Sequence, residues 1–321
     1  MPGVNVISKN NAWAPSSFPV AGRLPRETLK VVGNYEMQTA EEKRFRHSTN
    51  SDGRKQHSEC CHSLHISLFF DGTNNNDDND RKKNHPSNIS KLFHASLRDK
   101  QAEARGYFSY YMPGVGTAFP EIGELDYSEG GLKYATGGED RINWALVSVV
   151  HALTSALAKQ DLSKTERKHA VGSMSTWKAP LMIAMGKGNR RRTMDKLLKP
   201  LQDLTGRARP RVLGIKLYVY GFSRGAAQAR TFVTWLSELF DTPPGAERPT
   251  QSLIGLPVSV EFLGVLDTVA SVGIAHAAPF FAGHMDLADD TQQLPDAQRF
   301  TGQVKHCLLQ KNCRICYIVT Y

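Results

Sequence analysis

Apolar runs with strand character alternate along this chain with segments of helical periodicity. The strand candidates are residues 64–70, 107–112, 214–220 and 258–266. The clearest helix candidate is 141–158, where apolar residues recur on one face. Because parallel strands need long crossover connections, this alternation favours a mainly parallel sheet with helices on both faces. The sequence therefore predicts an α/β fold.

A G-x-S-x-G pentapeptide at 221–225 lies between the strand candidate 214–220 and a helical run. A serine on so sharp a turn needs small neighbours, since a Cβ at Gly221 or Gly225 would crowd the adjacent backbone. This context makes Ser223 a candidate nucleophile, and the N–H of Arg224 can hold an oxyanion. The alternative is a chance match, because this pattern also occurs in ordinary glycine-containing loops.

Three strand candidates end in polar turns, and in a parallel sheet such ends share one edge. The turns begin at Asp71, at Gly221 and at Asp267. Their convergence would join the Ser223 nucleophile to Asp267, an acid that orients a histidine, and to the N–H groups of Gly72 and Thr73 as further oxyanion donors. The order serine then aspartate fits α/β-hydrolases. Alternatively, Asp267 is an ordinary turn residue after a strand.

The general base is not apparent from the sequence. After Asp267 the histidines are His276, His284 and His306, and none lies in a pattern that marks a catalytic base. Without an imidazole, the Ser223 hydroxyl is a poor nucleophile at neutral pH.

Neither a metal nor a cofactor is predicted. Asp71 could bind amides of its own turn, hold the serine loop, or join neighbouring carboxylates around a cation, but the spacing does not match an EF-hand loop. We favour a structural turn. The clustered cysteines after His306 lack a second spaced pair, which argues against zinc.

The positive charge of the chain is concentrated in one segment. The formal net charge is +9, and residues 159–211 hold fourteen Lys or Arg against four Asp or Glu. Such a segment suits anionic phosphate surfaces. Together with the apolar residues 180–185, it could act as a lid that contacts lipid headgroups through residues 190–192. The alternative is a solvated surface. Nucleic acid is disfavoured because aromatic residues are not interleaved with these charges.

The N-terminal segment of the chain shows no sustained helical or strand periodicity. Residues 1–62 are polar and proline-broken, which predicts a weakly ordered segment before a domain at 63–321. No secretory signal is apparent, and five cysteines, two of them adjacent, fit a reducing compartment. The sequence thus predicts a protein that is cytoplasmic in the cell that makes it.

Four motifs in order carry a family resemblance. They are residues 69–75, 114–117, 221–227 and 264–273. Over about 64–307 the chain resembles the DUF2235 family of α/β-hydrolases, most closely the Tle1 group of type VI secretion system (T6SS) effectors, which are antibacterial phospholipases. The resemblance implies that Ser223 is the nucleophile and Asp267 the triad acid.

The same resemblance implies partners and a destination. These are a phospholipid membrane surface, a cognate immunity protein, and secretion spike or adaptor proteins, with delivery to the periplasm of target cells. In that family the catalytic histidine lies well downstream of the aspartate, and residues 308–321 do not match. We therefore expect a hydrolase domain that is incomplete at the C-terminus, with a tail typical of a frameshift. The alternative function is an inactive remnant that acts as a binding or decoy protein.

Overall fold

The computed structural model describes residues 61–129, 137–175, 186–245 and 249–269, and the backbone of two short strands at 304–308 and 317–319. All of them lie in one compact unit, formed by Cys60–Leu308 and Tyr317–Tyr321. The expected N-terminal segment 1–62 falls almost wholly outside the described residues, as do the apolar run 180–185 and the tail between the last two strands.

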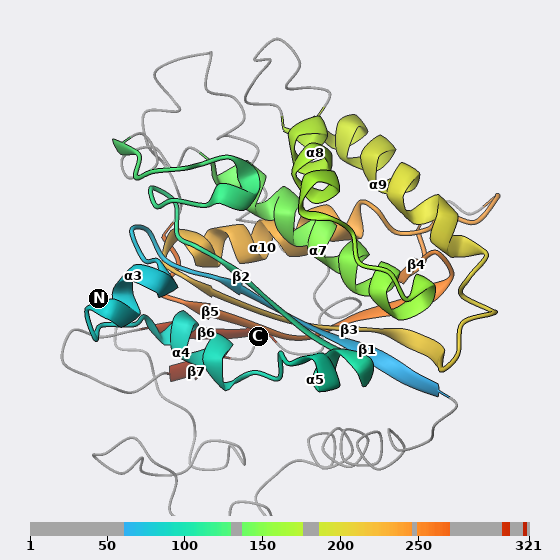
Figure 1. The fold of residues 1–321 in the computed structure, drawn as a ribbon, viewed down its shortest axis with the longest axis horizontal. Coiled ribbons are helices and arrows are strands. Elements are labelled where there is room, and N and C mark those ends of the chain that lie inside the picture. Colours follow the sequence, from blue (N-terminus) through green and yellow to red (C-terminus); the bar gives the residue numbers. More distant parts are fainter. Residues whose placement is uncertain are drawn as a thin grey trace, which may run out of the picture. The chain divides into compact units, whose positions relative to one another are not determined.

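A mainly parallel sheet forms the centre of this unit (Figure 1). Its parallel strands, in spatial order, are β2 (Tyr107–Met112), β1 (Cys61–Phe70), β3 (Arg211–Phe222), β5 (Leu256–Leu266) and β6 (Val304–Leu308). Two short strands are antiparallel to their neighbours: β4 (Ser252–Leu253) pairs with β5, and β7 (Tyr317–Val319) pairs with β6. The four predicted strands are confirmed, and β3 is longer at both ends than the pattern suggested.

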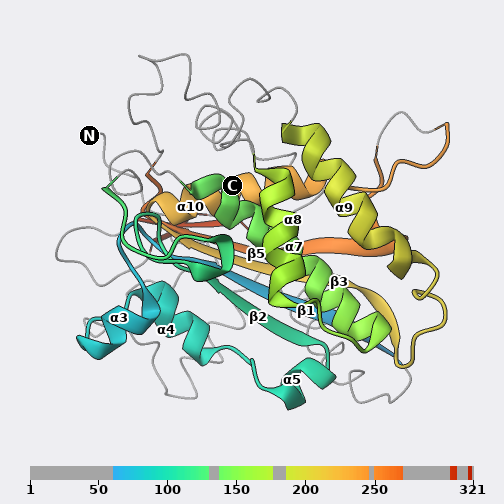
Figure 2. The ribbon, with the colours of Figure 1, turned by 45° about the horizontal axis from the view of Figure 1, so that its top comes forward.

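Helices cover both faces of the sheet, as predicted (Figure 2). On one face lie α7 (Gly138–Ala158) and α10 (Arg224–Ser237), with α8 (Lys164–Met174) and α9 (Gly186–Gln202) packed outside α7. On the other face lie α3 (Asp77–Lys82), α4 (Asn88–Ala95) and α5 (Lys100–Ala104), and a 3₁₀ turn, Pro120–Ile122, follows β2. None of the described helices is long and apolar enough to cross a membrane.

The core forms where strand alternation meets α7 and α10. Leu64, Ile66, Leu68 and Phe70 of β1 all point to that face and are completely buried. Helix α7 is buried over most of its circumference, because β1 and β2 lie on one side of it and α8 and α9 on the other. This layering explains why α7 is the most apolar of the helices that the structure describes.

The basic segment 159–211 is helical over much of its length. The sequence predicts that this segment is an insertion, which stays a prediction. The structure places α8 and α9 in it, and most of their residues are not buried. Arg190 is buried over the Trp235 ring, 3.6 Å from its centroid, and Arg191 donates to the carbonyls of Glu238 and Phe240. Two of the three arginines expected to meet headgroups therefore fasten α9 to the end of α10.

His151 of α7 makes stability depend on pH. Burial, and next the charge of Arg167, lowers the pKa of His151 below 6.5, although Asp161 acts in the opposite direction. The native state thus resists protonation, so its stability is intact above pH 6.5 and falls as the pH drops toward the folded-state pKa. We expect His151→Gln to flatten this fall between pH 6.5 and 5, by at most about 1.4 kcal/mol per pH unit. Urea unfolding at a series of pH values measures it. Exposed His169→Gln is the control, and equal curves for the two variants would contradict the assignment.

Candidate active site

Three strand ends lie side by side at one edge of the sheet. Phe70 pairs with Gly221, and Phe222 pairs with Leu266, so the turns after β1, β3 and β5 are neighbours. The strand order also reverses around β1, because β2 lies on one side of it and β3 on the other. In open α/β sheets, ligands bind outside the carboxyl ends of strands at such a reversal. The predicted convergence of the three turns is therefore present.

Ser223 occupies a sharp and strained turn between β3 and α10. Its backbone has φ 55° and ψ −123°, a conformation that residues with a Cβ rarely adopt. Two backbone hydrogen bonds hold Ser223 beside β5. The Ser223 N–H donates to the Leu266 carbonyl (2.9 Å), and the Val269 N–H donates to the Ser223 carbonyl (3.2 Å). The side chain stays half-exposed at the N-terminus of α10. This is the geometry of a nucleophile elbow.

The glycines on either side of the turn allow three elements to meet. A Cβ on Gly221 would lie 2.6 Å from the Ala226 Cα in α10, and one on Gly225 would lie 2.3 Å from the Asp71 carbonyl oxygen. Both contacts are with backbone atoms, which cannot give way as a side-chain tip can. The predicted need for small residues at these two positions is confirmed.

The turn after β1 is fastened to the serine turn. Arg224 Nε donates to Thr73 Oγ1 at 2.5 Å, which joins the residue after Ser223 to the Asp71–Thr73 turn. Of the two amides predicted as further oxyanion donors, that of Gly72 donates to Asp71 Oδ1 (2.7 Å). No described residue accepts a hydrogen bond from the N–H of Thr73. Thr73 is therefore better placed than Gly72 to bind an incoming anion.

Asp71 is a structural turn residue. Its carboxylate is buried and accepts from the Ser87 hydroxyl and the Tyr111 hydroxyl (2.6 Å each), besides the Gly72 N–H and the Asn75 amide. Burial raises the pKa of Asp71, and these hydrogen bonds oppose that rise. Among the described residues no cluster of His, Cys, Asp or Glu is suited to a metal ion. The Asp71 carboxylate thus holds the turn after β1, the end of β2 and the start of α4 together.

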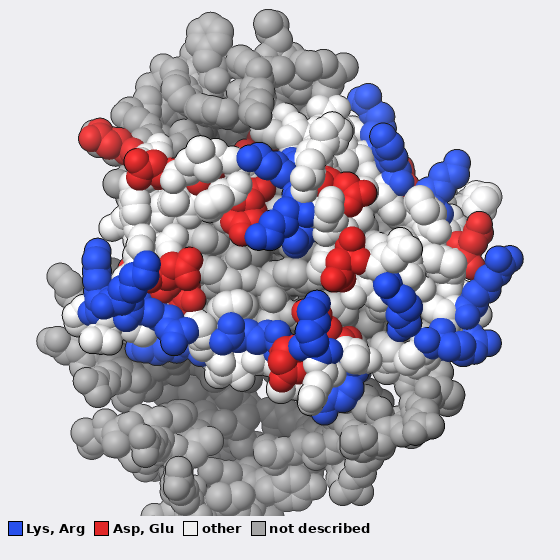
Figure 3. Space-filling view, in the orientation of Figure 1, with Lys and Arg blue, Asp and Glu red and all other residues white. Residues whose placement is uncertain are grey.

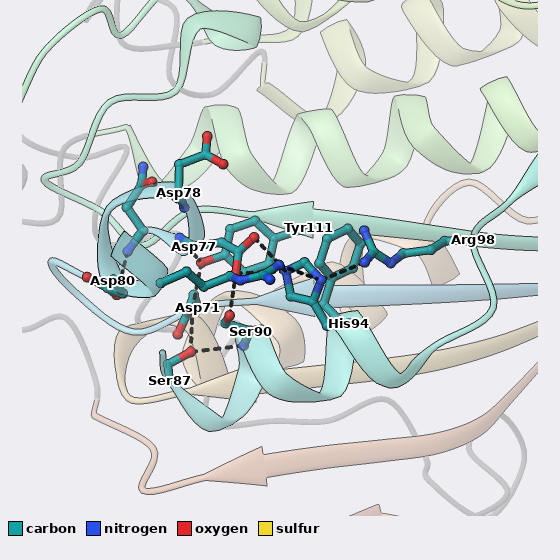
Figure 4. A network of polar contacts seen from close by, with 12 residues as sticks. Asp71, Asp77, Asp78, Asp80, Ser87, Ser90, His94, Arg98 and Tyr111 are labelled. Carbon is teal, nitrogen blue, oxygen red and sulfur yellow. Dashed lines mark hydrogen bonds and ion pairs between the residues drawn. The ribbon is translucent and has the colours of Figure 1, made fainter. Parts of the chain in front are cut away.

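A second polar cluster adjoins this turn and was missed in the sequence (Figure 4). The Asp77 N–H donates to the Tyr111 hydroxyl (3.1 Å), and the Asp77 carboxylate contacts His94 Nε2 (2.8 Å) and the Ser90 hydroxyl. Ser90 and His94 lie four residues apart, on the same face of α4. The spacing of Ser90 and His94 was the signal in the sequence for a shared partner. The partner, Asp77, could be identified only from the packing of α3 against α4.

Asp267 follows β5 directly, next to the serine turn. It has a positive φ of 47° and an exposed side chain, which makes no hydrogen bond to any described residue. Of the candidate histidines, His276 and His284 lie outside the described residues. The backbone of His306 lies in β6 and pairs with Val265. The described residues therefore bring Ser223 and Asp267 to one edge and leave the choice of base open.

Comparison with known proteins gives a family and a fold. No curated protein matches the chain. A crystal structure of an uncharacterized protein from Pseudomonas aeruginosa is similar, with 39% identity and a TM-score of 0.71, over 92% of this chain and 40% of that one. The chain thus spans about two fifths of that protein's length. Residues 65–172 match the family described as "T6SS, Phospholipase effector Tle1-like, catalytic domain". Over this region the chain is therefore similar to the catalytic domain of Tle1-like T6SS phospholipase effectors.

Proposed function

We propose that this chain is a serine lipid esterase that cleaves phospholipid esters through an acyl-enzyme. The observation that supports it most is the strained Ser223 turn at the N-terminus of α10, at the edge where β1, β3 and β5 end. The family match adds the substrate class, since the matched family is described as a phospholipase effector.

The reaction would proceed in two steps. Ser223 Oγ attacks the ester carbonyl carbon while a histidine takes its proton, and Asp267 orients that histidine. The N–H groups of Arg224 and Thr73 hold the negative oxygen of the tetrahedral intermediate. The intermediate collapses as the histidine returns the proton to the leaving alcohol. Water, activated by the same base, then attacks the acyl carbon and releases the fatty acid and free Ser223.

Partners and destination follow from the family and belong to the same proposal. A T6SS effector needs a secretion spike or adaptor to carry it, an immunity protein to protect its producer, and the membrane of a target cell as its substrate. Co-purification with such partners tests this part of the proposal separately from catalysis.

The test is phospholipid hydrolysis by the purified chain, with a fluorophosphonate probe to label the activated serine. We expect fatty acid release and one adduct, mapped by mass spectrometry to Ser223. Single replacements of His276, His284 and His306 by Ala then identify the base as the one whose loss abolishes both signals. Folded protein with neither release nor labelling would overturn the esterase and favour the alternative, a catalytically inactive binding or decoy protein.

A further inference from the structure

The carboxyl edge of the sheet carries basic and exposed apolar side chains near the turn that follows β1. Helix α3 follows the β1 turn directly, and its end is strongly basic: Arg81, Lys82 and Lys83 are all exposed. Lys91 of α4 is exposed beside it. Figure 3 shows blue side chains gathered over α3. This edge is also where the three strand-end turns meet.

The basic side chains border a hollow between α3 and α4. It has a volume of about 590 Å³ and is lined by Arg81, Asn84, His85, Pro86 and Lys91. Its lining holds two permanent positive charges and no carboxylate. Ser87 follows Pro86 in the chain, and its hydroxyl donates to the Asp71 carboxylate in the turn after β1. A phosphate group in this hollow would therefore lie next to the residues that fasten α4 to the turn after β1.

Helix α3 also carries three carboxylates, Asp77, Asp78 and Asp80, all in its first turn. Asp77 is bound to His94 and Ser90, and Asp80 accepts from the N–H of Asn76 at the start of α3 (2.9 Å). Both carboxylates thus serve the N-terminal end of the helix, whereas the lysines lie at its opposite end.

Apolar side chains are exposed on the same edge. Leu125 is 78% exposed and Tyr127 is 45% exposed, in the loop after β2. The Tyr127 hydroxyl accepts from Asn79 Nδ2 of α3 (2.6 Å), so this loop adjoins the basic helix. Basic residues beside exposed Leu and Tyr are typical of surfaces that lie in the membrane interface.

We propose that Lys82, Lys83, Lys91, Leu125 and Tyr127, hereafter the edge patch, bind the surface of an anionic lipid bilayer and present the Ser223 turn to it. This inference rests on the proposed lipid substrate. It differs from the sequence-based expectation of a lid at 159–211, because Arg190 and Arg191 of that segment are engaged within the fold. Charge attracts the patch to phosphate headgroups, and the apolar side chains enter the interface.

The test is sedimentation of the full chain with phosphatidylglycerol-containing vesicles, in a Ser223→Ala background so that the lipid stays intact. Since each lysine near an anionic surface contributes about fivefold, we expect Lys82→Glu/Lys83→Glu/Lys91→Glu to weaken binding at least about 100-fold. The matched control is Lys196→Glu/Lys199→Glu/Arg207→Glu, three exposed residues in and after α9. Both variants lower the net charge equally, but the control should bind within about threefold of the parent.

A second pair of variants tests the apolar part. Leu125→Gln should weaken vesicle binding about tenfold, because a leucine no longer enters the interface. Leu213→Gln is its control, since Leu213 is 52% exposed near the amino end of β3, at the opposite edge of the sheet. Equal losses in both members of either pair would overturn the edge patch. So would binding that does not depend on phosphatidylglycerol, or binding of a DNA duplex in place of vesicles.

Failure of this inference can be told from failure of the proposed function. With Ser223 intact, hydrolysis of a short-chain phospholipid in monomeric solution needs the active site and no bilayer. Edge-patch variants should keep that rate and lose only hydrolysis of vesicles. Loss of both rates in a folded variant would contradict a docking role, whereas a parent inactive on monomers but bound to vesicles would refute only the esterase.

Discussion

Ser223→Ala is expected to reduce phospholipid hydrolysis at least about 1000-fold. The hydroxyl is the protein group that is proposed to form a bond to the acyl carbon, so without it no acyl-enzyme can form. Losses of this size or larger are found when the serine of a triad is removed. What remains would come from the oxyanion donors and from substrate binding alone.

The same substitution should leave the fold intact. Alanine has the same Cβ as serine and adopts the strained turn at no greater cost, and no hydrogen bond of the Ser223 hydroxyl to a described residue would be lost. We expect the free energy of unfolding to change by less than about 0.5 kcal/mol. Ser173→Ala, on the exposed face of α8, is the matched control and should keep full activity. A Ser223→Ala protein with more than a tenth of the parent rate would refute the nucleophile.

Gly225→Ala is expected to destabilise the protein by about 2–4 kcal/mol. The added Cβ would lie 2.3 Å from the Asp71 carbonyl oxygen and 2.5 Å from that of Phe70. Because both are backbone atoms of the β1 end, α10 must move away from the sheet, and overpacking of this kind is costly. The shift would also move Ser223 relative to Thr73, so activity should fall together with stability.

A glycine elsewhere in a helix provides the contrast. Gly172 in α8 has no atom within 4 Å of an added Cβ. Gly172→Ala should therefore stabilise the protein by about 0.5–1 kcal/mol, through helix propensity alone. Urea unfolding of both variants measures the two effects, which should have opposite signs. If Gly225→Ala were as stable as the parent, the close contact between α10 and the end of β1 would be absent.

Local patterns in the sequence predicted much of the fold correctly. Alternating burial in β1 and the continuous apolar character of α7 are visible in the order of residues, because each element meets the core along most of its length. Helices α8 and α9 were less apparent. They form an outer layer on α7, so only a few of their residues are buried, and their composition is mostly polar and basic.

The candidate site was predictable only in part. Ser223 was found because its turn depends on a few neighbouring residues with strict steric needs. Two other contacts depend on how β1, α3 and α4 pack. They are the hydrogen bond from the Gly72 N–H to Asp71 and the contact between Asp77 and His94. The residues next to such side chains in the sequence do not indicate which partners they contact.

By itself, the sequence determined the α/β class and the Ser223 turn, since periodicity and steric restriction act over a few residues. Only the tertiary structure decided which strand ends are neighbours and which amide near Ser223 already has an acceptor. It also decided that Arg190 and Arg191 fasten α9 whereas Lys82 and Lys83 remain exposed. The physical reason is that charge and hydrogen-bonding capacity belong to a residue, but their use depends on neighbours that are distant in the chain.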